Sequence, residues 1–502
     1  MSRKLTPPST PESLRRFLDA ACPDHHVRGG PAYVVARGTA ERLLRRHPEL
    51  ARDGLVPAVV TGDLTAVQRL LAERPEAADE RQGPKGWTPL LYLCFTRLAL
   101  PAVAEHAVAI ARLLLDHGAD PNAYFMAGDS RYTPLVGVVG EGEEERPPHP
   151  RRDDLARLLL ERGAEPYDLQ VVYDIHFRGR VLWFLRLMHE HALRLGRAAD
   201  WADPEWHMLD MGPYGSGARW HLQIALDHDD LALADWVLAH GASPNAAPAR
   251  DPRLPQRSLH EEAVRRGQTA LAELLVRHGA TPSGAVADDE SAFVAACLHL
   301  DRDEAARLAR AHPEYLRRIT AVVAAARQDR AEVMQLLLDL GMSTEVEDGE
   351  RRRPLHIAAM RDAPRMAALL IARGAGIDPV EATWHNTPLD FAVYHQLPRI
   401  IELLAPHSRD VWNLAFTGHV ARLREVLAAA PELARVANAN DATPLYWLPD
   451  DEARAAEVVA LFLAHGADPA TRRKDGATAA DVASRRGLDA AAALLRTAMA
   501  GA

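Results

Sequence analysis

Hydrophobic and polar positions recur along this chain in pairs of short segments, each with the spacing of an amphipathic helix. In residues 386–407, apolar side chains at Leu389, Phe391 and Ala392 predict the buried face of one helix. After a short polar break, a second segment carries an apolar stripe formed by Ile400, Ile401, Leu403 and Leu404. Helices of this length are only marginally stable in water, so we expect each pair to fold by stacking on neighbouring pairs.

The ends of these predicted helices carry their own signals. Thr387 and Pro388 stand where the first helix begins, because Thr caps free backbone N–H groups and Pro loses no hydrogen bond at the first helical position. Second helices close on glycine, which adopts the left-handed conformation that ends a helix at little steric cost. The closing glycines Gly341 and Gly374 lie 33 residues apart. A Gly-Ala closure recurs at residues 118–119, 163–164, 241–242, 279–280, 374–375 and 466–467.

Two further signals mark helix ends. A histidine in the last turn can donate a hydrogen bond to the free carbonyl groups there, so a structural role is predicted for the four histidines that precede a closing glycine: His117, His240, His278 and His465. Other helices are expected to stop at a Pro-Glu pair. These pairs are residues 48–49, 75–76, 313–314 and 431–432.

The order of these features resembles the ankyrin repeat. It comprises a Thr-Pro-Leu-like start, a short helix, a break, and a second helix closing on Leu-Leu-x-x-Gly-Ala, with a period of 33 residues. The resemblance covers most of residues 55–167 and 219–495, in divergent copies with insertions. It implies an all-α solenoid of about 13 stacked helix pairs joined by turn or hairpin loops.

We expect five regions along the chain. Residues 1–30 are predicted to form a tail and a capping helix that starts at the Ser-x-x-Glu box of Ser9. Residues 31–167 are predicted to be ankyrin repeats, two of them with insertions, and residues 168–218 an irregular Trp-rich insert. Repeats are expected again in residues 219–283 and 284–502, the latter with a C-terminal cap.

The two insertions are predicted to differ in character. The copies that start at Trp87 and Tyr132 are each about 10 residues longer than the template between their helices. Residues 97–106 are apolar enough to extend helices. Residues 140–152 are rich in Gly, Glu, Pro and Arg, which predicts an exposed loop, either merely solvated or a docking element.

The stretch 168–218 departs from the repeat pattern. Its first half has apolar residues for two more helices, but no Thr-Pro-Leu or Gly-Ala frames them. Its second half brings Trp201, Trp206 and Trp220 together within 20 residues. These rings either fill a seam between mis-spaced repeats or form a working site, since long irregular loops are often functional.

Composition narrows the class of partner and compartment. The net charge of -10 disfavours a general nucleic-acid or membrane surface. The 59 basic residues include only three lysines, a bias typical of a GC-rich bacterial genome. Three widely spaced cysteines fit a reduced compartment. No signal peptide and no membrane-spanning apolar run is evident, so the chain is expected to be cytoplasmic.

The usual catalytic and metal-binding signatures are missing from the sequence. The chain has no Walker loop, no His-Glu-x-x-His and no Gly-x-Ser-x-Gly. His25 and His26 are adjacent, which places them on different faces of any regular element. We therefore expect a non-enzymatic protein with no cofactor and no metal. The alternative is an enzyme, or a regulatory subunit of one, whose site is built from residues 168–218, with polar side chains converging beside Trp206: His176, His189, His207 and Asp210.

The resemblance implies a scaffold or adaptor that binds a partner protein through turn tips and first helices on a concave surface. Before binding, the chain is expected to be a monomer. Carried over motif by motif, the partner-binding positions are Lys85, Trp87, Phe95, Tyr132, Glu141, Arg219, Asp227, His228, Arg352, Met360, Arg361, Trp384, His385, Asn386, Tyr394 and His395. A second candidate site comprises Trp201, Trp206, Tyr214 and Trp220.

Overall fold

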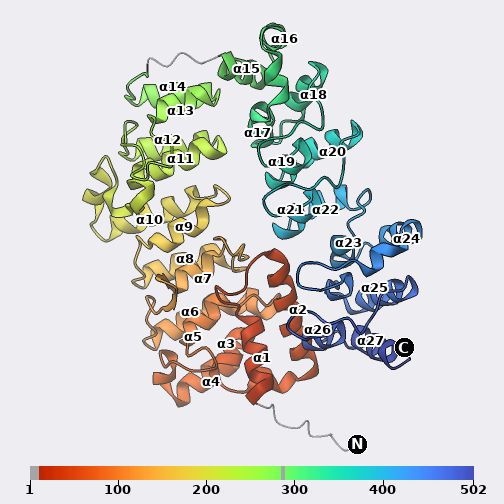
Figure 1. Cartoon of the computed structure of the whole chain (residues 1–502). Coiled ribbons are helices and arrows are strands. Elements are labelled where there is room, and N and C mark those ends of the chain that lie inside the picture. The colour runs from red at the N-terminus through yellow and green to blue at the C-terminus, as the bar shows by residue number, and fades with distance from the viewer. Residues whose placement is uncertain (1–10, 284–288, 502) are drawn as a thin grey trace, which may run out of the picture. The chain divides into compact units, whose positions relative to one another are not determined.

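The computed structural model describes residues 11–283 and 289–501, which are helical apart from one small hairpin and connecting turns (Figure 1). The predicted capping residue Ser9 lies outside the described residues. The chain divides into two compact units. The terminal unit combines the stretch up to Phe177 with the stretch from Arg409 onward, and the central unit spans Arg178–Ser408. The predicted all-α class is confirmed, whereas the number of helix pairs and the five region boundaries stay predictions.

The terminal unit contains both ends of the described chain. Its first part comprises α1 (Pro11–Ala21), α2 (Gly30–Arg46), η1 (Pro48–Arg52), α3 (Leu55–Thr61), α4 (Leu64–Glu73), η2 (Pro75–Ala78), α5 (Pro89–Phe95), α6 (Pro101–Asp116), β1 (Phe125–Ala127), β2 (Ser130–Tyr132), α7 (Pro134–Val139), α8 (Arg152–Glu161) and α9 (Leu169–His176). Its last part comprises α23 (Val411–Thr417), α24 (Val420–Ala429), η7 (Pro431–Arg435), η8 (Pro444–Tyr446), α25 (Glu452–Ala464), α26 (Ala479–Arg486) and α27 (Asp489–Ala500). Strands β1 and β2 pair antiparallel, with Phe125 opposite Tyr132.

The central unit begins with α10 and ends with α22. Its elements are α10 (Leu182–Arg194), η3 (Ala198–Ala202), η4 (His207–Leu209), η5 (Gly212–Tyr214), α11 (Gly217–His228), α12 (Leu231–Ala239), α13 (Leu259–Arg265), α14 (Thr269–Arg277), α15 (Asp289–Leu298), α16 (Arg302–Ala311), η6 (Pro313–Arg317), α17 (Thr320–Ala326), α18 (Ala331–Asp339), α19 (Pro354–Met360), α20 (Pro364–Ala372), α21 (Pro388–Tyr394) and α22 (Pro398–Leu404). Helices α9 and α10 confirm the two helices expected in the first half of residues 168–218.

The core of each unit lies between two rows of helices. First helices stack on first helices, as in α3, α5, α7 and α9, and second helices stack on second helices, as in α4, α6 and α8. The central unit repeats this arrangement with α15, α17, α19 and α21 in one row and α18, α20 and α22 in the other. Each short helix therefore buries its apolar stripe against its neighbours, which is how a solenoid gains stability.

The predicted helix start at Thr387 is confirmed. Thr387 caps α21, where its hydroxyl accepts a hydrogen bond from the Asp390 N–H at 3.1 Å and the Asp390 carboxylate accepts one from the Thr387 N–H at 2.7 Å. Thr478 and Asp481 form the same reciprocal pair at α26. The backbone donors that a helix start leaves free are thereby satisfied.

The predicted helix ends are also confirmed in most copies. The Nδ1–H groups of His117, His240 and His465 donate to the carbonyl oxygen four residues earlier, at 2.8, 2.7 and 2.9 Å. His278 differs, since its Nε2 atom lies 3.6 Å from the Asp235 carboxylate. At each Pro-Glu pair the helix stops and the proline begins a short 3-10 helix, namely η1, η2, η6 or η7.

The two insertions have different outcomes. The first extends helix α6 to sixteen residues, as expected. The prediction of an exposed loop at residues 140–152 is wrong, because Glu141, Glu144, Arg146 and His149 are buried there. A β-bridge between Glu141 and Arg146 closes the segment into a turn. Backbone hydrogen bonds then hold it in place, from the Gly142 N–H to the Asp174 carbonyl at 3.0 Å and from the Gly29 N–H to the Glu144 carbonyl at 2.9 Å.

Helix α2, from the first part of the terminal unit, contacts α26 from its last part. The Arg42 side chain is 4% exposed and donates to the Asp450 carboxylate at 2.7 Å. Its other nitrogens donate to the carbonyl oxygens of Asp450 and Arg486, each at 2.8 Å. The beginning of the chain thus covers helices that would otherwise end a stack.

Candidate functional site

The turn at residues 381–386, which precedes α21, is held by one buried carboxylate. Glu381 has no exposed surface, and its two oxygens accept hydrogen bonds from the backbone N–H groups of Thr383 at 2.7 Å, Trp384 at 2.7 Å and Asn386 at 3.0 Å. Burial acts to raise the pKa of Glu381, but these N–H donors outweigh it and the pKa is lowered. The carboxylate therefore stays ionised and fixes the backbone of the turn.

Neighbouring repeats also hold this turn. The Ala382 N–H donates to the Glu350 carbonyl of the preceding turn at 2.8 Å. His356, fully buried in α19, donates from Nε2 to the Asn386 carbonyl at 3.3 Å and accepts at Nδ1 from the Arg353 N–H at 3.1 Å. Successive turns thus form a connected edge along the repeats.

Three of the predicted partner-binding residues around this turn are exposed. Trp384 is 62% exposed and Tyr394, at the end of α21, is 39% exposed. His385 is exposed and adopts a left-handed φ of 59°, which turns the chain at the tip. Asn386 and His395 are half-buried. These five predicted residues are gathered around the start and end of α21.

The remaining predicted positions of the central unit are largely engaged. Arg352 pairs with Asp348 at 2.7 Å and lies 3.4 Å from Glu350. Arg219 is 2% exposed and donates to the Arg257 carbonyl at 3.1 Å. The other predicted positions there are half-buried or exposed and lie at the ends of α11 and α19: Asp227, His228, Met360 and Arg361.

The predicted positions in the terminal unit offer little contact surface, because all but the half-buried Lys85 are buried. Trp87 is 4% exposed, and its ring stacks on that of Phe125 with centroids 4.3 Å apart. Phe95 and Tyr132 belong to the same aromatic cluster, at 5.2 and 5.4 Å from Phe125. The hairpin β1–β2 supplies Phe125 and so places a ring over Trp87. Lys85 pairs with Asp24 at 2.7 Å, and Glu141 lies in the buried turn described above.

Beside this cluster lies a buried group of charges. The Arg146 side chain has no exposed surface, and its guanidinium lies 5.2 Å from the ring centres of both Phe95 and Tyr132. Its Nη2 atom is 3.6 Å from the Glu144 carboxylate, which also accepts a hydrogen bond from the Tyr132 hydroxyl at 3.0 Å. Burial acts to lower the pKa of Arg146, but Tyr33 and the neighbouring acids outweigh it and the pKa is raised.

Asp174 completes this group from helix α9. It is 1% exposed, its Oδ1 atom accepts from Gln170 Nε2 at 2.8 Å, and its Oδ2 atom has no hydrogen-bond partner among the described residues. Burial raises the pKa of Asp174 to about 7, against the attraction of Arg146. The sequence offered no signal for this site, since the charges come from an insertion and from a helix outside the repeat pattern.

Asp174→Asn is expected to make the stability of the chain less dependent on pH. The pKa of Asp174 is about 7 in the folded chain and 3.8 in the unfolded chain. Between these two pH values the folded chain keeps the proton that the unfolded chain has released. The free energy of unfolding therefore falls as pH rises from about 4 to 7. An amide does not titrate and avoids that cost. We therefore expect Asp174→Asn to raise the free energy of unfolding by about 1 to 3 kcal/mol at pH 8 and by little at pH 5. Thermal melts at both pH values measure it. The control Asp153→Asn, at a carboxylate 69% exposed, should change neither melt; a gain from Asp174→Asn that is equal at both pH values would refute the titration.

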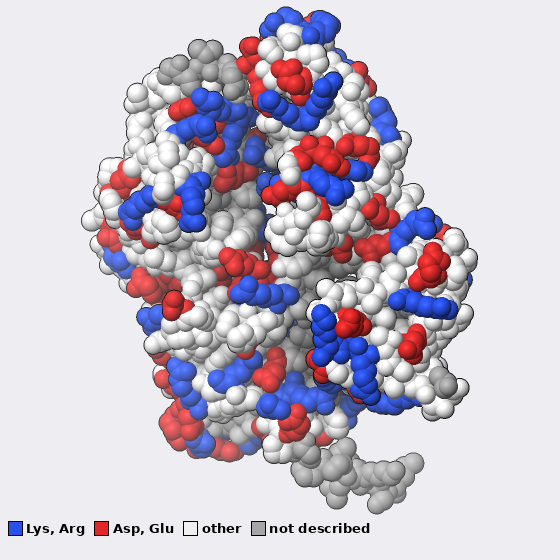
Figure 2. All heavy atoms as spheres, viewed as in Figure 1, with Lys and Arg blue, Asp and Glu red and all other residues white. Residues whose placement is uncertain are grey.

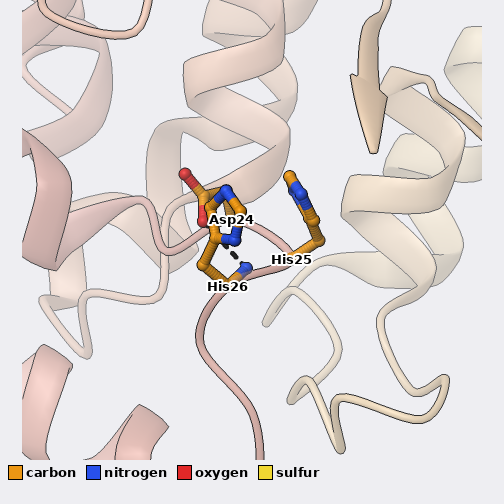
Figure 3. Close-up of side chains that lie close together, drawn as sticks. All are labelled: Asp24, His25 and His26. Atoms are coloured by element: carbon orange, nitrogen blue, oxygen red, sulfur yellow. Dashed lines mark hydrogen bonds between the residues drawn. The ribbon is translucent and has the colours of Figure 1, made fainter. Parts of the chain in front are cut away.

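A second polar group lies at the turn of Asp24, His25 and His26, where three potential metal-binding atoms lie within 4.8 Å of one another (Figure 3). The segment is a turn and not a regular element, so the adjacent His25 and His26 need not face apart, and their ring centroids are 3.9 Å apart. The Lys85 ammonium, 2.7 Å from an Asp24 oxygen, competes with any cation for that ligand. The contacts therefore describe a cross-link between this turn and Lys85.

The tryptophans of the second candidate site form a core. Trp201 is 4% and Trp206 0% exposed, and their rings meet edge to face with centroids 4.8 Å apart. Trp236 of α12 joins them, 6.0 Å from Trp201 and 6.3 Å from Trp206. Trp220 is 7% exposed and packs against Tyr214, which is 37% exposed. The rings fill the space between the irregular segment and α11–α12.

The polar residues suggested for an enzyme have separate partners. His189 packs against Trp201, with ring centroids 4.8 Å apart. His207 is 64% exposed and pairs with Asp203, and Asp210 pairs with Arg250 at 3.0 Å. His176 belongs to the terminal unit and hydrogen-bonds the Tyr173 carbonyl.

The thiols of Cys22 and Cys297 are not poised as nucleophiles. Burial raises the pKa of both to about 12, which leaves them protonated and unreactive at neutral pH.

Comparison with known proteins assigns the repeats. A family model described as three copies of the ankyrin repeat matches residues 322–415, and a model of a single ankyrin repeat matches residues 85–124. The potassium channel GORK of Arabidopsis thaliana is 33% identical over 96 residues, which are 19% of this chain and 11% of the channel, so the chain spans about a tenth of that relative. A crystal structure of an ankyrin repeat domain from Acinetobacter baumannii AYE is 23% identical, covers 35% of this chain and 96% of its own, and superposes with a TM-score of 0.28.

The stacked helix pairs and their capped turns define a helical repeat protein with two rows of helices. The family matches identify those repeats, and the chain is an ankyrin-repeat protein. Ankyrin repeats are in general protein–protein interaction modules. In the described part of the chain, every helix is too short or too polar to cross a membrane.

Proposed function

We propose that this chain is a non-enzymatic adaptor that binds a partner protein through the turn at residues 381–386 and the adjoining first helices. The observation that supports it best is Trp384, which is 62% exposed on a turn whose backbone is fixed by the buried Glu381 carboxylate. Tryptophan and tyrosine dominate binding energies at protein interfaces.

The rigidity of the turn strengthens this proposal. A backbone that is already held in place loses little conformational entropy when a partner binds, so more of the contact energy appears as affinity. His385, next to Trp384 in the chain, and Tyr394, at the end of α21, add further polar and aromatic surface. Acidic and basic side chains are interspersed over the face in Figure 2, a pattern that suits a specific protein partner better than a polyanion.

The proposal also includes the setting in which the chain acts. We take it to be a bacterial, cytoplasmic protein that is monomeric before it binds. The arginine-rich, lysine-poor composition supports a bacterial source. The three cysteines are buried and unpaired, which suits a reducing compartment.

Trp384→Ala is expected to weaken binding of the partner by about thirtyfold or more, because truncation of an interface tryptophan commonly removes about 2 kcal/mol or more of binding free energy. The measurement is quantitative affinity capture from the native cells with full-length wild type and variant. Thermal melts verify that both proteins are folded. The melting temperature of the variant should be nearly that of wild type, because the ring contributes little to the core.

The matched control is Trp447→Ala, at a ring 37% exposed in the terminal unit. Partners that are retained by wild type and Trp447→Ala but lost by Trp384→Ala would support the proposal. Capture that is equal for all three proteins would refute it for this turn.

A further inference from the structure

Three arginines occupy the same position in three repeats of the central unit. Arg266, Arg327 and Arg361 each directly follow the last residue of the first helix of their repeat, α13, α17 and α19 respectively. The carbonyl end of a helix carries partial negative charge, so arginine is favourable there. Only Arg361 was selected from the sequence, but the shared position was a signal that could also have identified the other two.

These helix ends meet the end of α11. The Arg266 guanidinium pairs with the Asp227 carboxylate at 2.6 Å, and Gln328 Nε2 donates to Asp229 Oδ2 at 2.6 Å although the two residues are 99 positions apart. Figure 2 shows a hollow in the central unit between the region of α11–α14 and that of α17–α20, with acidic and basic atoms in its walls. The arginines therefore lie where the repeats of α11–α14 approach the repeats of α17–α20.

The three arginines differ in whether an acidic side chain pairs with them. Arg266 is neutralised by Asp227 and, at 2.9 Å, by Glu262. Within residues 11–283 and 289–501, by contrast, no hydrogen bond or ion pair engages the side chains of Arg327 and Arg361, and the Nε atom of Arg327 is buried without a partner. Burial, followed by repulsion from Arg266 and Arg361, lowers the pKa of Arg327 to about 10, so the guanidinium is still charged at neutral pH.

We propose that Arg327 and Arg361 bind the carboxylates of an acidic peptide segment of the partner protein. The inference rests on the proposed function and names the chemistry of its partner. Guanidinium groups form bidentate, charge-assisted hydrogen bonds with carboxylates, and two such groups on adjacent repeats offer two binding points. Asp227, Asp229 and Glu262 lie close by and would repel the closely spaced phosphates of a nucleic acid.

The test uses the full chain and fluorescein-labelled hexaglutamate, followed by fluorescence anisotropy in about 50 mM salt, where exposed charges are incompletely screened. Wild type is expected to bind, and the double variant Arg327→Gln/Arg361→Gln to bind about tenfold more weakly. The matched control is Arg302→Gln/Arg365→Gln, which removes the same charge from side chains 63% and 67% exposed in the same unit. It should bind like wild type.

Three results would overturn this inference. They are the absence of hexaglutamate binding by wild type, equal weakening in both double variants, and tighter binding of a six-residue oligothymidylate than of hexaglutamate. The protein partner captured in the Trp384 experiment separates the two proposals. Thermal melts first verify that the Arg327→Gln/Arg361→Gln variant is folded. If this variant captures that partner as well as wild type does, the acidic-segment proposal fails while the adaptor function stands.

Discussion

Arg146→Met is expected to lower the free energy of unfolding of the terminal unit by about 3 to 5 kcal/mol, the usual cost of removing one partner from a buried ion pair. Methionine keeps much of the side-chain volume but leaves the Glu144 and Asp174 carboxylates buried without their cation. It also removes the charge that lies against the rings of Phe95 and Tyr132. Chemical denaturation followed by circular dichroism measures the loss, which should be larger at pH 8 than at pH 5.

Arg131→Met provides the matched control, because Arg131 stacks on Tyr124 at the exposed surface of the hairpin and forms no part of the buried group. We expect it to change stability by about 0.5 kcal/mol or less. The triple variant Arg146→Met/Glu144→Gln/Asp174→Asn should recover part of the lost stability, since it removes the charges together. Equal stability of Arg146→Met and Arg131→Met would contradict the buried network.

Trp206→Ala is expected to cost about 3 to 5 kcal/mol, as for other large buried aromatic side chains. Trp206 has no exposed surface and contacts the rings of Trp201 and Trp236, so its loss leaves a cavity where the irregular segment meets α12. The melting temperature of the central unit should fall by about 10 °C. Near-ultraviolet circular dichroism during heating reports this change, because it is sensitive to packed tryptophans.

Trp384→Ala serves as the control for this prediction, since it is the same substitution in the same unit at a ring that is 62% exposed. Its melting temperature should lie within about 2 °C of wild type. If Trp206→Ala melted equally close to wild type, the aromatic core between the irregular segment and α11–α12 would not contribute to stability as its burial implies.

Local signals in the sequence predicted most of the fold. Thr387 and Pro388 begin a helix because capping and the missing proline N–H act within one turn of chain. The histidines before the closing glycines reach a carbonyl four residues earlier, which is likewise a local contact. The helical period of the apolar residues then required stacked pairs, and the family matches confirm the repeat.

Positions that depend on contacts between distant residues could not be predicted in the same way. The charged insertion at residues 140–152 was expected in solvent, because charge alone favours hydration. Asp174, Gly29 and Tyr132 instead enclose it, and both Asp174 and Gly29 lie outside the repeat that carries the insertion. The same limit applies to Trp87, whose position in its repeat suggested exposure until the ring of Phe125 covered it.

The sequence by itself determined the class of the protein and the ends of its clearly patterned helices, because these follow from interactions within a few residues and from a regular period. Only the tertiary structure decided which side chains are available to a partner. Trp384 is exposed and Trp206 is buried although both lie in irregular segments, since burial depends on what packs over a side chain, and that is set by segments far away in the chain.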